Sequence, residues 1–345
     1  MKVLVTGGAG YLGSVLVPKL ILRGHEVKVL DIGYFGIEHF RAMRPAVEIV
    51  RDDIRRICGD KKLLQDALSG CDAVIHLAAM SNDPSAELNP ELTDQVNFQC
   101  TRAMAAAAKA HNIPFLFSSS CSVYGESPDE VDEDGKVAPL TAYARSKVDS
   151  ERFLLETATS AWRPVILRNG TLFGYSQRMR FDLVVNIFSY CTVLYNEVRI
   201  FGDGRQWRPF LHVADCARAF VHFLERPDHR HLVYNIAYEN FRVVDLYDIF
   251  KAIKPSCNAT YLKVDNPDTR DYHVSTARMK ADGFAPDVTV RDGAQEMMEA
   301  IVTGRIADPE AVYYRNAKWM KELTTLGQTD HTQLVRFIEA MSSMR

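Results

Sequence analysis

The stretch that decides the fold of this chain is Lys2-Val3-Leu4-Val5-Thr6-Gly7-Gly8-Ala9-Gly10-Tyr11-Leu12-Gly13. A short apolar strand, residues 2–6, leads into glycines at positions 7, 10 and 13, and a helix is expected over residues 10–23. The first glycine allows a sharp turn, the second lets a diphosphate approach the backbone, and the third lets the helix pack closely on the sheet. The amides at the helix N-terminus then face the phosphates. The stretch predicts a floor for the diphosphate of a dinucleotide.

An acidic residue some 20 positions later supports this prediction. The second expected strand, residues 26–30, ends in Asp31, where a carboxylate can accept hydrogen bonds from both ribose hydroxyls. Asp31 would repel a 2′-phosphate, and neither Arg23 nor Lys28 stands directly after it, so NAD is favoured over NADP. The alternative interpretation of Asp31 is a cap of the turn before Gly33.

Strands and helices alternate along the first half of the chain. Further apolar strands are expected at residues 47–50, 73–77, 115–118 and 165–168, with helices at 60–68, 88–111 and 140–157. This spacing predicts an α/β fold, a Rossmann-type doubly wound parallel sheet with helices on both faces.

The regular alternation of expected strands and helices ends after about residue 171. We expect an NAD-binding Rossmann domain made of residues 1–175 and about 209–250, which includes a helix at 212–224 and a strand at 232–237. Residues about 176–208 and 251–345, richer in Arg, Asp, Pro and Tyr, would form a smaller, discontinuous substrate-binding lobe at the carboxyl ends of the strands. From Pro309 onward the sequence predicts two amphipathic helices.

Composition excludes several function classes. The chain has 345 residues, 25% of them charged, and its formal net charge of -3 gives no electrostatic reason to bind nucleic acid or an anionic membrane. Neither a signal peptide nor a membrane span is apparent. The ten histidines lack metal-type spacing, and the seven cysteines contain no C-x-x-C pair, which is typical of reduced thiols in a cytoplasmic protein. We therefore expect no metal.

Two further motifs bear chemistry. Tyr143 and Lys147 lie four residues apart on an expected helix, so their side chains face the same way. A free phenol has a pKa of about 10, and a nearby ammonium and a cationic nicotinamide ring favour the phenolate, so Tyr143 is a candidate general base. Tyr-x-x-x-Lys is common by chance, but the hydroxyl-rich stretch 118–122 follows a strand about twenty residues earlier and can bind the reacting oxygen.

With these motifs the sequence resembles the extended short-chain dehydrogenase/reductase family, in its NAD-dependent nucleotide-sugar epimerase/dehydratase branch. The matching residues are T-G-G-A-G-Y-L-G at 6–13, Asp31, Asp53-Ile54, H-L-A-A at 76–79, Val96-Asn97, S-S-S-C-S-V-Y-G at 118–125, Y-A-R-S-K at 143–147, Leu167-Arg168, Phe173-Gly174, R-P-F-L-H-V at 208–213, Asp215 and Tyr234-Asn235.

The resemblance implies roles for individual residues. Tyr143, Lys147 and Ser120 would be catalytic. The cofactor would be bound by Gly7, Gly10, Tyr11, Leu12, Gly13, Asp31, Asp53, Ile54, Leu77, Ala78, Ala79, Asn97, Ser118, Tyr143 and Lys147. The substrate would be bound by Ser81, Ser120, Ser122, Thr171, Arg178, Arg180, Arg208 and Arg270, with the last two gripping a nucleoside diphosphate. The alternative for each arginine is an exposed surface charge, and for Arg178 and Arg180 a solvated helix face.

Departures from the family pattern narrow the expected chemistry. Dehydratases of the branch carry Asp-Glu directly after the catalytic Ser/Thr, where this chain has Cys121 and Ser122, so 4,6-dehydration is not expected. Thr171 stands where the family usually has an asparagine that contacts the sugar or phosphate. We expect a nucleotide-sugar epimerase that abstracts hydride at C4.

Three alternatives to an epimerase stay open: a nucleotide-sugar 4-dehydrogenase or 4-keto-sugar reductase, an enzyme acting on a non-sugar alcohol, and a non-catalytic NAD-binding sensor. The resemblance further implies a homodimer that pairs the helices expected at 88–111 and 140–157.

Overall fold

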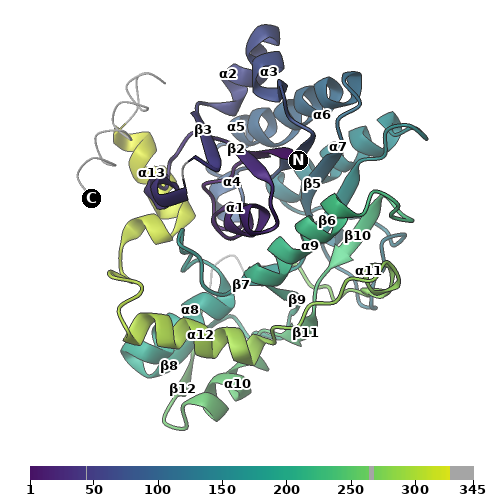
Figure 1. Ribbon diagram of the computed structural model, residues 1–345. Coiled ribbons are helices and arrows are strands. Elements are labelled where there is room, and N and C mark those ends of the chain that lie inside the picture. Colours follow the sequence, from purple (N-terminus) through teal and green to yellow (C-terminus); the bar gives the residue numbers. More distant parts are fainter. Residues whose placement is uncertain (44, 264–267, 327–345) are drawn as a thin grey trace.

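A parallel sheet of seven strands forms the centre of the computed structural model, which describes residues 1–43, 45–263 and 268–326 (Figure 1). Its strands, in spatial order, are β10 (Val233–Ile236), β6 (Val165–Asn169), β5 (Phe115–Ser120), β4 (Ala73–His76), β1 (Lys2–Thr6), β2 (Glu26–Asp31) and β3 (Val47–Arg51). Every neighbouring pair is parallel. The predicted doubly wound fold is confirmed.

Alternate residues of the strands enter two different cores, because successive side chains of a strand point to opposite faces. Val3 and Val5 of β1 pack in one core with α1 (Gly13–Leu22) and α9 (Val213–Glu225). Leu4 packs in the other core. The helices that contribute to this second core are α2 (Ile54–Gly59), α3 (Lys61–Leu68), α6 (Cys100–Ala110) and α7 (Ala142–Thr157).

The helix expected at residues 88–111 is interrupted. After α4 (Asp83–Ala86) come α5 (Pro90–Asp94), a π-helical turn (Gln95–Gln99) and then α6. The π turn has Asn97 at its centre, and the Asn97 carbonyl accepts hydrogen bonds from the hydroxyls of Thr101 and Ser150. Single π turns within helices are frequent at functional sites. Here the turn directs Asn97 toward α7.

A second group of elements lies at the carboxyl ends of the large sheet. It contains β7 (Thr171–Phe173), α8 (Val184–Tyr195), β8 (Glu197–Phe201), β9 (Trp207–His212), β11 (Glu239–Arg242), α10 (Leu246–Ile253), β12 (Asn258–Leu262) and α12 (Val290–Val302). Strands β11, β9 and β7 form one small sheet, and β12 and β8 form another. Phenylalanines 173, 188, 210 and 250 are buried in a core of their own. The predicted division into two domains, with its boundaries, stays a prediction.

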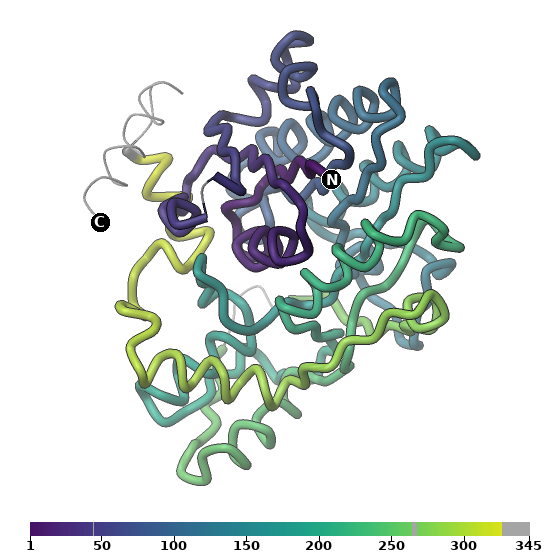
Figure 2. Tube along the Cα trace, viewed as in Figure 1, coloured from purple at the N-terminus to yellow at the C-terminus, as the bar shows by residue number. Residues whose placement is uncertain are grey.

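The chain then returns to the large sheet. Figure 2 shows it running from α12 along one side of the molecule to α13 (Asn316–Leu326), beside the segment that follows β2. Helix α13 is the first of the two helices expected after Pro309, and the second falls outside the described residues. Within the ranges described, no helix combines the length and the apolar character needed to cross a membrane.

A buried ion pair fixes α7 against the sheet. Arg168 of β6 donates to Glu151 of α7 from Nε (3.1 Å) and from Nη2 (2.7 Å), and the two residues are 5% and 3% exposed. Ser119 of β5 also donates to Glu151, and Arg168 Nη1 donates to the hydroxyl of Tyr124 (2.8 Å). One carboxylate therefore links α7 to two neighbouring strands.

We predict that Glu151→Gln lowers the free energy of unfolding by about 3–5 kcal/mol, because it leaves the Arg168 charge buried without its partner. Asp149→Asn is the matched control on the same helix: Asp149 pairs with Arg152 at the surface, and such pairs contribute about 0–1 kcal/mol. Urea unfolding followed by circular dichroism measures both. Equal losses in the two variants would contradict the prediction.

Candidate active site

A cavity of about 1270 Å³ lies at the carboxyl ends of the large sheet. Its wall includes the glycine turn after β1, the ends of β2, β5 and β6, the loop after β4, and residues from the second group of elements and from α13. Small-molecule sites usually occupy about 300–1,000 Å³, so this cavity has room for two ligands side by side.

The glycine turn has the shape that a dinucleotide diphosphate requires. Gly7 has a φ of +69°, and a Cβ there would lie 2.6 Å from the backbone nitrogen of Ala78. A Cβ at Gly13 would lie 2.3 Å from the carbonyl oxygen of Gly8, so only glycine lets α1 begin this close to the turn. The amides of a first helical turn have no partner within the helix and can bind phosphate oxygens. Gly10, Tyr11 and Leu12 line the cavity here.

Acidic residues stand where the adenosine half of the dinucleotide would lie. Asp31 accepts hydrogen bonds from the amides of Ala9 (2.9 Å) and Gly33 (2.7 Å). It therefore also makes the turn contact that was the alternative interpretation. Burial raises the pKa of Asp31, and both hydrogen bonds oppose the rise. Asp53 caps α2, pairs with Arg55 at 2.6 Å and lines the cavity together with Ile54. These groups fit NAD.

Helix α7 brings the predicted catalytic residues together. Lys147 Nζ donates to the carbonyl of Ser118 (2.7 Å) and lies 5.6 Å from the centre of the Tyr143 ring. Ser120, at the end of β5, is one of the groups that lower the pKa of the Tyr143 phenol, and its hydroxyl accepts from the amide of Ser122 (3.2 Å). The phenol, the hydroxyl and the amine thus form one continuous group beside the cavity.

Burial has the largest effect on the pKa values of this group. Burial raises the pKa of Tyr143, Asp83 raises it further, and Ser120 and Arg180 lower it. Burial also lowers the pKa of Lys147 to about 7. The expectation that Lys147 and a cationic nicotinamide ring together favour the phenolate concerns the NAD-bound enzyme and stays a prediction. A cationic nicotinamide ring beside the phenol would act in the opposite direction to burial.

Asn97 joins the loop after β4 to α7. Its Oδ1 accepts from the amide of Met80 (2.7 Å), and its Nδ2 donates to the hydroxyl of Ser146 (3.0 Å), next to Lys147. Leu77, Ala78 and Ala79 of the same loop line the cavity. Asn97 is 1% exposed, so it supports the site from behind.

Arg208 and Arg270, predicted to bind a diphosphate, meet around one carboxylate. Asp268 accepts from Nη2 of Arg208 (2.8 Å) and from Nε of Arg270 (2.8 Å), and the two arginines lower its pKa. Arg270 also pairs with Asp83, which accepts from the hydroxyl of Thr141, the N-cap residue of α7. The carboxylates of Asp268 and Asp83 thus hold both guanidinium groups at the wall of the cavity.

Arg178 and Arg180 are 5% and 6% exposed, so the alternative of a solvated helix face is wrong for both. Their environments differ. Arg180 pairs with Asp182 (2.9 Å) and is one of the charges that act on Tyr143. Arg178 lies over the ring of Phe35 at 3.5 Å, in the segment that follows Asp31. The structure thus places Arg178 on the cofactor side of the cavity.

The remaining predicted substrate residues also line the cavity: Ser81, Ser122 and Thr171. The hydroxyl of Ser122 is buried and has no hydrogen-bond partner within the described ranges, which leaves it available to a ligand. Sequence reasoning missed several lining residues, namely Asn82, Asp83, Asn169, Asp182, Asp268 and Asn316. Asn169 could have been found, because it ends a predicted strand at the edge of the sheet where ligands bind.

Comparison with known proteins places this site in a family. The model of the NAD dependent epimerase/dehydratase family matches residues 3–237. The chain belongs to this family. Its members are enzymes of the extended short-chain dehydrogenase/reductase group, and NAD is their cofactor.

The proteins that this chain resembles differ in the reactions that their names describe. "UDP-glucuronic acid decarboxylase 1" of Arabidopsis thaliana is 29% identical over 315 residues, 86% of this chain and 69% of that protein. A "Putative UDP-glucose 4-epimerase" of Methanocaldococcus jannaschii is 29% identical over 304 residues, 86% and 97% of the two chains. A crystal structure of UDP-glucuronic acid 4-epimerase from Bacillus cereus, in complex with UDP-glucuronic acid and NAD, has a TM-score of 0.75 and 25% identity, and covers 88% of this chain and 99% of its own.

We predict that Asp83→Asn shifts the acid limb of the kcat–pH profile of the NAD-loaded enzyme to lower pH. Asp83 raises the pKa of Tyr143, so its neutralisation makes the phenolate available at lower pH. Initial rates measured across the pH range with saturating substrate test this, with Asp149→Asn as the control. An unchanged acid limb would show that Asp83 does not act on the phenol.

Proposed function

We propose that this enzyme is an NAD-dependent nucleotide-sugar epimerase acting at C4 of the sugar. The observation that carries the proposal is the grouping of Ser120, Tyr143 and Lys147 beside a cavity that also holds Arg208 and Arg270. The first group suits proton removal from a hydroxyl. The second suits a diphosphate, because a guanidinium binds phosphate oxygens through two parallel hydrogen bonds.

The residues divide the work as follows. The Tyr143 phenolate takes the proton of the C4 hydroxyl, and Ser120 donates a hydrogen bond to the same oxygen while it becomes a carbonyl. Lys147 would stabilise the phenolate and hold the nicotinamide ribose. Bound NAD would supply the acceptor for the hydride of C4 and the donor for its return. The keto-sugar then rotates and presents its opposite face, while Arg208 and Arg270 keep the diphosphate bound. Tyr143 returns the proton to the C4 oxygen when the hydride is returned.

The surroundings of Ser120 argue against 4,6-dehydration. The dehydratase acids would stand at Cys121 and Ser122. The thiol of Cys121 is 1% exposed, donates to the carbonyl of Arg168 (3.2 Å) and has its pKa raised by burial. Such a thiol neither donates nor accepts a proton at the sugar near neutral pH.

The substrate test uses the purified enzyme and a panel of UDP-, dTDP-, GDP- and CDP-sugars, including UDP-glucose and UDP-glucuronic acid. Products are identified by NMR, and NADH is followed by its absorbance. The proposal expects a C4 epimer without net NADH. Accumulation of NADH with a keto-sugar would instead identify a dehydrogenase, and loss of carbon dioxide from a uronic acid a decarboxylase; either result refutes the proposal. Reduction of an added 4-keto-sugar by NADH would identify a reductase.

We predict that Tyr143→Phe lowers kcat by a factor of at least about 10²–10⁴, because the general base is removed, while NAD stays bound. Tyr261→Phe, at an exposed tyrosine, is the control and should keep full activity. Bound NAD is measured after denaturation of the purified variants. Substantial turnover by Tyr143→Phe would exclude the phenol as the base.

We also propose a cytoplasmic homodimer, in which α6 and α7 of two copies pack together. The support is the family resemblance, the leucine at position 155 of α7, which is 41% exposed, and seven cysteines without a disulfide, as in a reducing compartment. Light scattering should give twice the mass of one chain, and Leu155→Glu should reduce it to one. Leu194→Glu, at an exposed leucine of α8, is the control. A monomeric parent protein would refute the dimer.

A further inference from the structure

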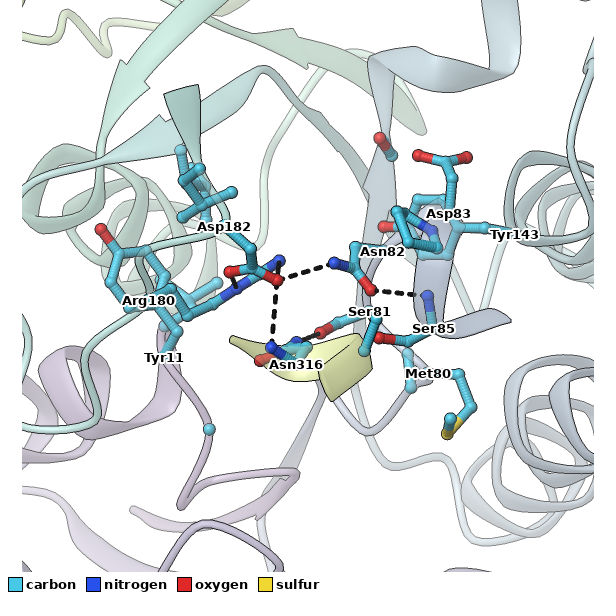
Figure 3. A pocket seen from close by; sticks show the side chains of 18 of the residues that line it. Tyr11, Met80, Ser81, Asn82, Asp83, Ser85, Tyr143, Arg180, Asp182 and Asn316 are labelled. Atoms are coloured by element: carbon cyan, nitrogen blue, oxygen red, sulfur yellow. Dashed lines mark hydrogen bonds and ion pairs between the residues drawn. The ribbon is translucent and has the colours of Figure 1, made fainter. Parts of the chain in front are cut away.

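Three distant segments of the chain meet across the cavity in a cluster that we call the clasp: Ser81, Asn82, Arg178, Asp182 and Asn316. Figure 3 shows Ser81, Asn82, Asp182 and Asn316 of this cluster. Asp182 accepts from Nδ2 of Asn82 (2.8 Å) and from the amide of Asn316 (3.3 Å). Asn316 in turn donates to the hydroxyl of Ser81 (3.2 Å) and accepts from Arg178. The clasp therefore ties the loop after β4, the segment after β7 and the start of α13 to one another.

Helix α13 extends this connection to the loop after β2. Trp319 Nε1 donates to the carbonyl of Tyr34 (2.7 Å). Trp319, Met320 and Leu323 are buried in a small apolar cluster with Tyr34, Phe35 and Met80. The loop with Phe35 follows Asp31, and the loop with Met80 follows Ala78 and Ala79. Helix α13 therefore packs against the two loops that border the cofactor residues, and its first turns line the cavity.

Arg178 is buried, and among the described residues no carboxylate forms an ion pair or a hydrogen bond with it. It donates from Nη1 to the carbonyl of Met179 (3.2 Å) and from Nη2 to Asn316, and its Nε has no partner in the described ranges. Arg180, Arg208 and Arg270 each pair with an aspartate. A buried guanidinium is costly unless an anion neutralises it, and burial accordingly lowers the pKa of Arg178 to about 9.

The position of Arg178 indicates which anion it meets. Ser176, two residues earlier, donates to the carbonyl of Tyr11 (2.8 Å), within the glycine turn that suits a dinucleotide diphosphate. Besides burial, Arg180 lowers the pKa of Arg178, and the carboxylates of Asp182 and Asp31 raise it. Arg178 thus lies near the glycine turn and against Phe35, in the segment that follows Asp31.

We propose that the clasp and α13 complete the cofactor site: Arg178, held by Asn316, binds the diphosphate of NAD, and α13 covers the bound dinucleotide so that it stays through successive turnovers. The proposed retention of NAD between turnovers rests on the proposed function. An enzyme that returns the hydride reuses the same NAD, whereas a net dehydrogenase must release NADH after each turnover. The diphosphate contact of Arg178 rests only on the NAD dependence of the family.

The first experiment measures cofactor retention without substrate. The full-length protein is loaded with isotope-labelled NAD and chased with unlabelled NAD, and the dissociation rate is followed by rapid gel filtration. Asn316→Ala removes the contacts to Arg178 and Ser81 and should release NAD about tenfold faster, as expected for a loss of about 1.4 kcal/mol. Lys321→Ala, at an exposed residue of α13, should not change the rate. Equal NAD dissociation rates for Asn316→Ala and the parent protein would refute the proposal that α13 covers the bound dinucleotide.

The second experiment asks which ligand Arg178 meets. Calorimetric titration of Arg178→Gln with NAD, ADP-ribose, adenosine and UDP should show NAD and ADP-ribose weakened about tenfold or more, the effect of one charged hydrogen bond, and adenosine and UDP unchanged. Weakened UDP with unchanged NAD would overturn the assignment and make Arg178 a substrate residue. Arg178→Lys keeps the charge and should bind NAD more tightly than Arg178→Gln; equal weakening in both would refute a role for the charge.

Both experiments are read in folded protein, which thermal unfolding confirms for each variant. If Arg178→Gln does not fold, Arg178→Lys and Asn316→Ala still decide the proposal by the same binding measurements. Because neither experiment uses a sugar substrate, their outcomes are independent of whether the enzyme epimerises. If the parent enzyme epimerises no sugar of the substrate panel but retains NAD as expected, the proposed function is refuted and the cofactor proposal is not.

Discussion

The buried pair of Arg168 and Glu151 is the interaction on which the geometry of the site depends. Tyr143, Lys147 and Glu151 lie at intervals of four residues on α7, so they share one face of the helix. By bonding to Arg168 of β6 and to Ser119 of β5, Glu151 fixes the rotation of that face against the sheet. Tyr143 and Lys147, two turns and one turn nearer the N-terminus, are then directed to Ser120 and Ser118 near the end of β5.

This pair also carries an energetic cost that an apolar contact would avoid. Two buried charges lose their hydration, and a well-packed apolar pair of the same volume is often equally stable. The ion pair instead fixes the orientation of α7, because a guanidinium that donates two parallel hydrogen bonds to one carboxylate does so in only one geometry. Near a site where the Tyr143 phenol must lie beside the Ser120 hydroxyl, a fixed orientation of α7 is worth more than a small gain in stability.

The sequence predicted the parts of the molecule that local patterns encode. The glycine turn, the seven strands of the large sheet and the Tyr143–Lys147 pair all depend on neighbours within a few residues, and the family resemblance added Ser120 and the arginines. The break in the helix at 88–111 was missed because a π turn depends on long-range contacts, here those of Asn97 with Met80 and Ser146. Asn316 and Phe35 were missed for the same reason, as they meet Arg178 only after the chain has folded.

Charge neutralisation explains how the two halves of the cavity differ. On the side of the cavity where we propose the substrate, Asp268 and Asp83 pair with Arg208 and Arg270, so a diphosphate would have to compete with these carboxylates and could leave again. On the side where we propose the cofactor, no carboxylate of the described residues is hydrogen-bonded to Arg178, so the diphosphate of a dinucleotide would add to the negative charge that Asp182 and Asp31 already supply. A ligand that must displace an internal carboxylate dissociates more readily than a ligand whose phosphate binds a guanidinium that has no hydrogen-bonded carboxylate to displace. This asymmetry suits an enzyme whose sugar nucleotide comes and goes while its NAD remains.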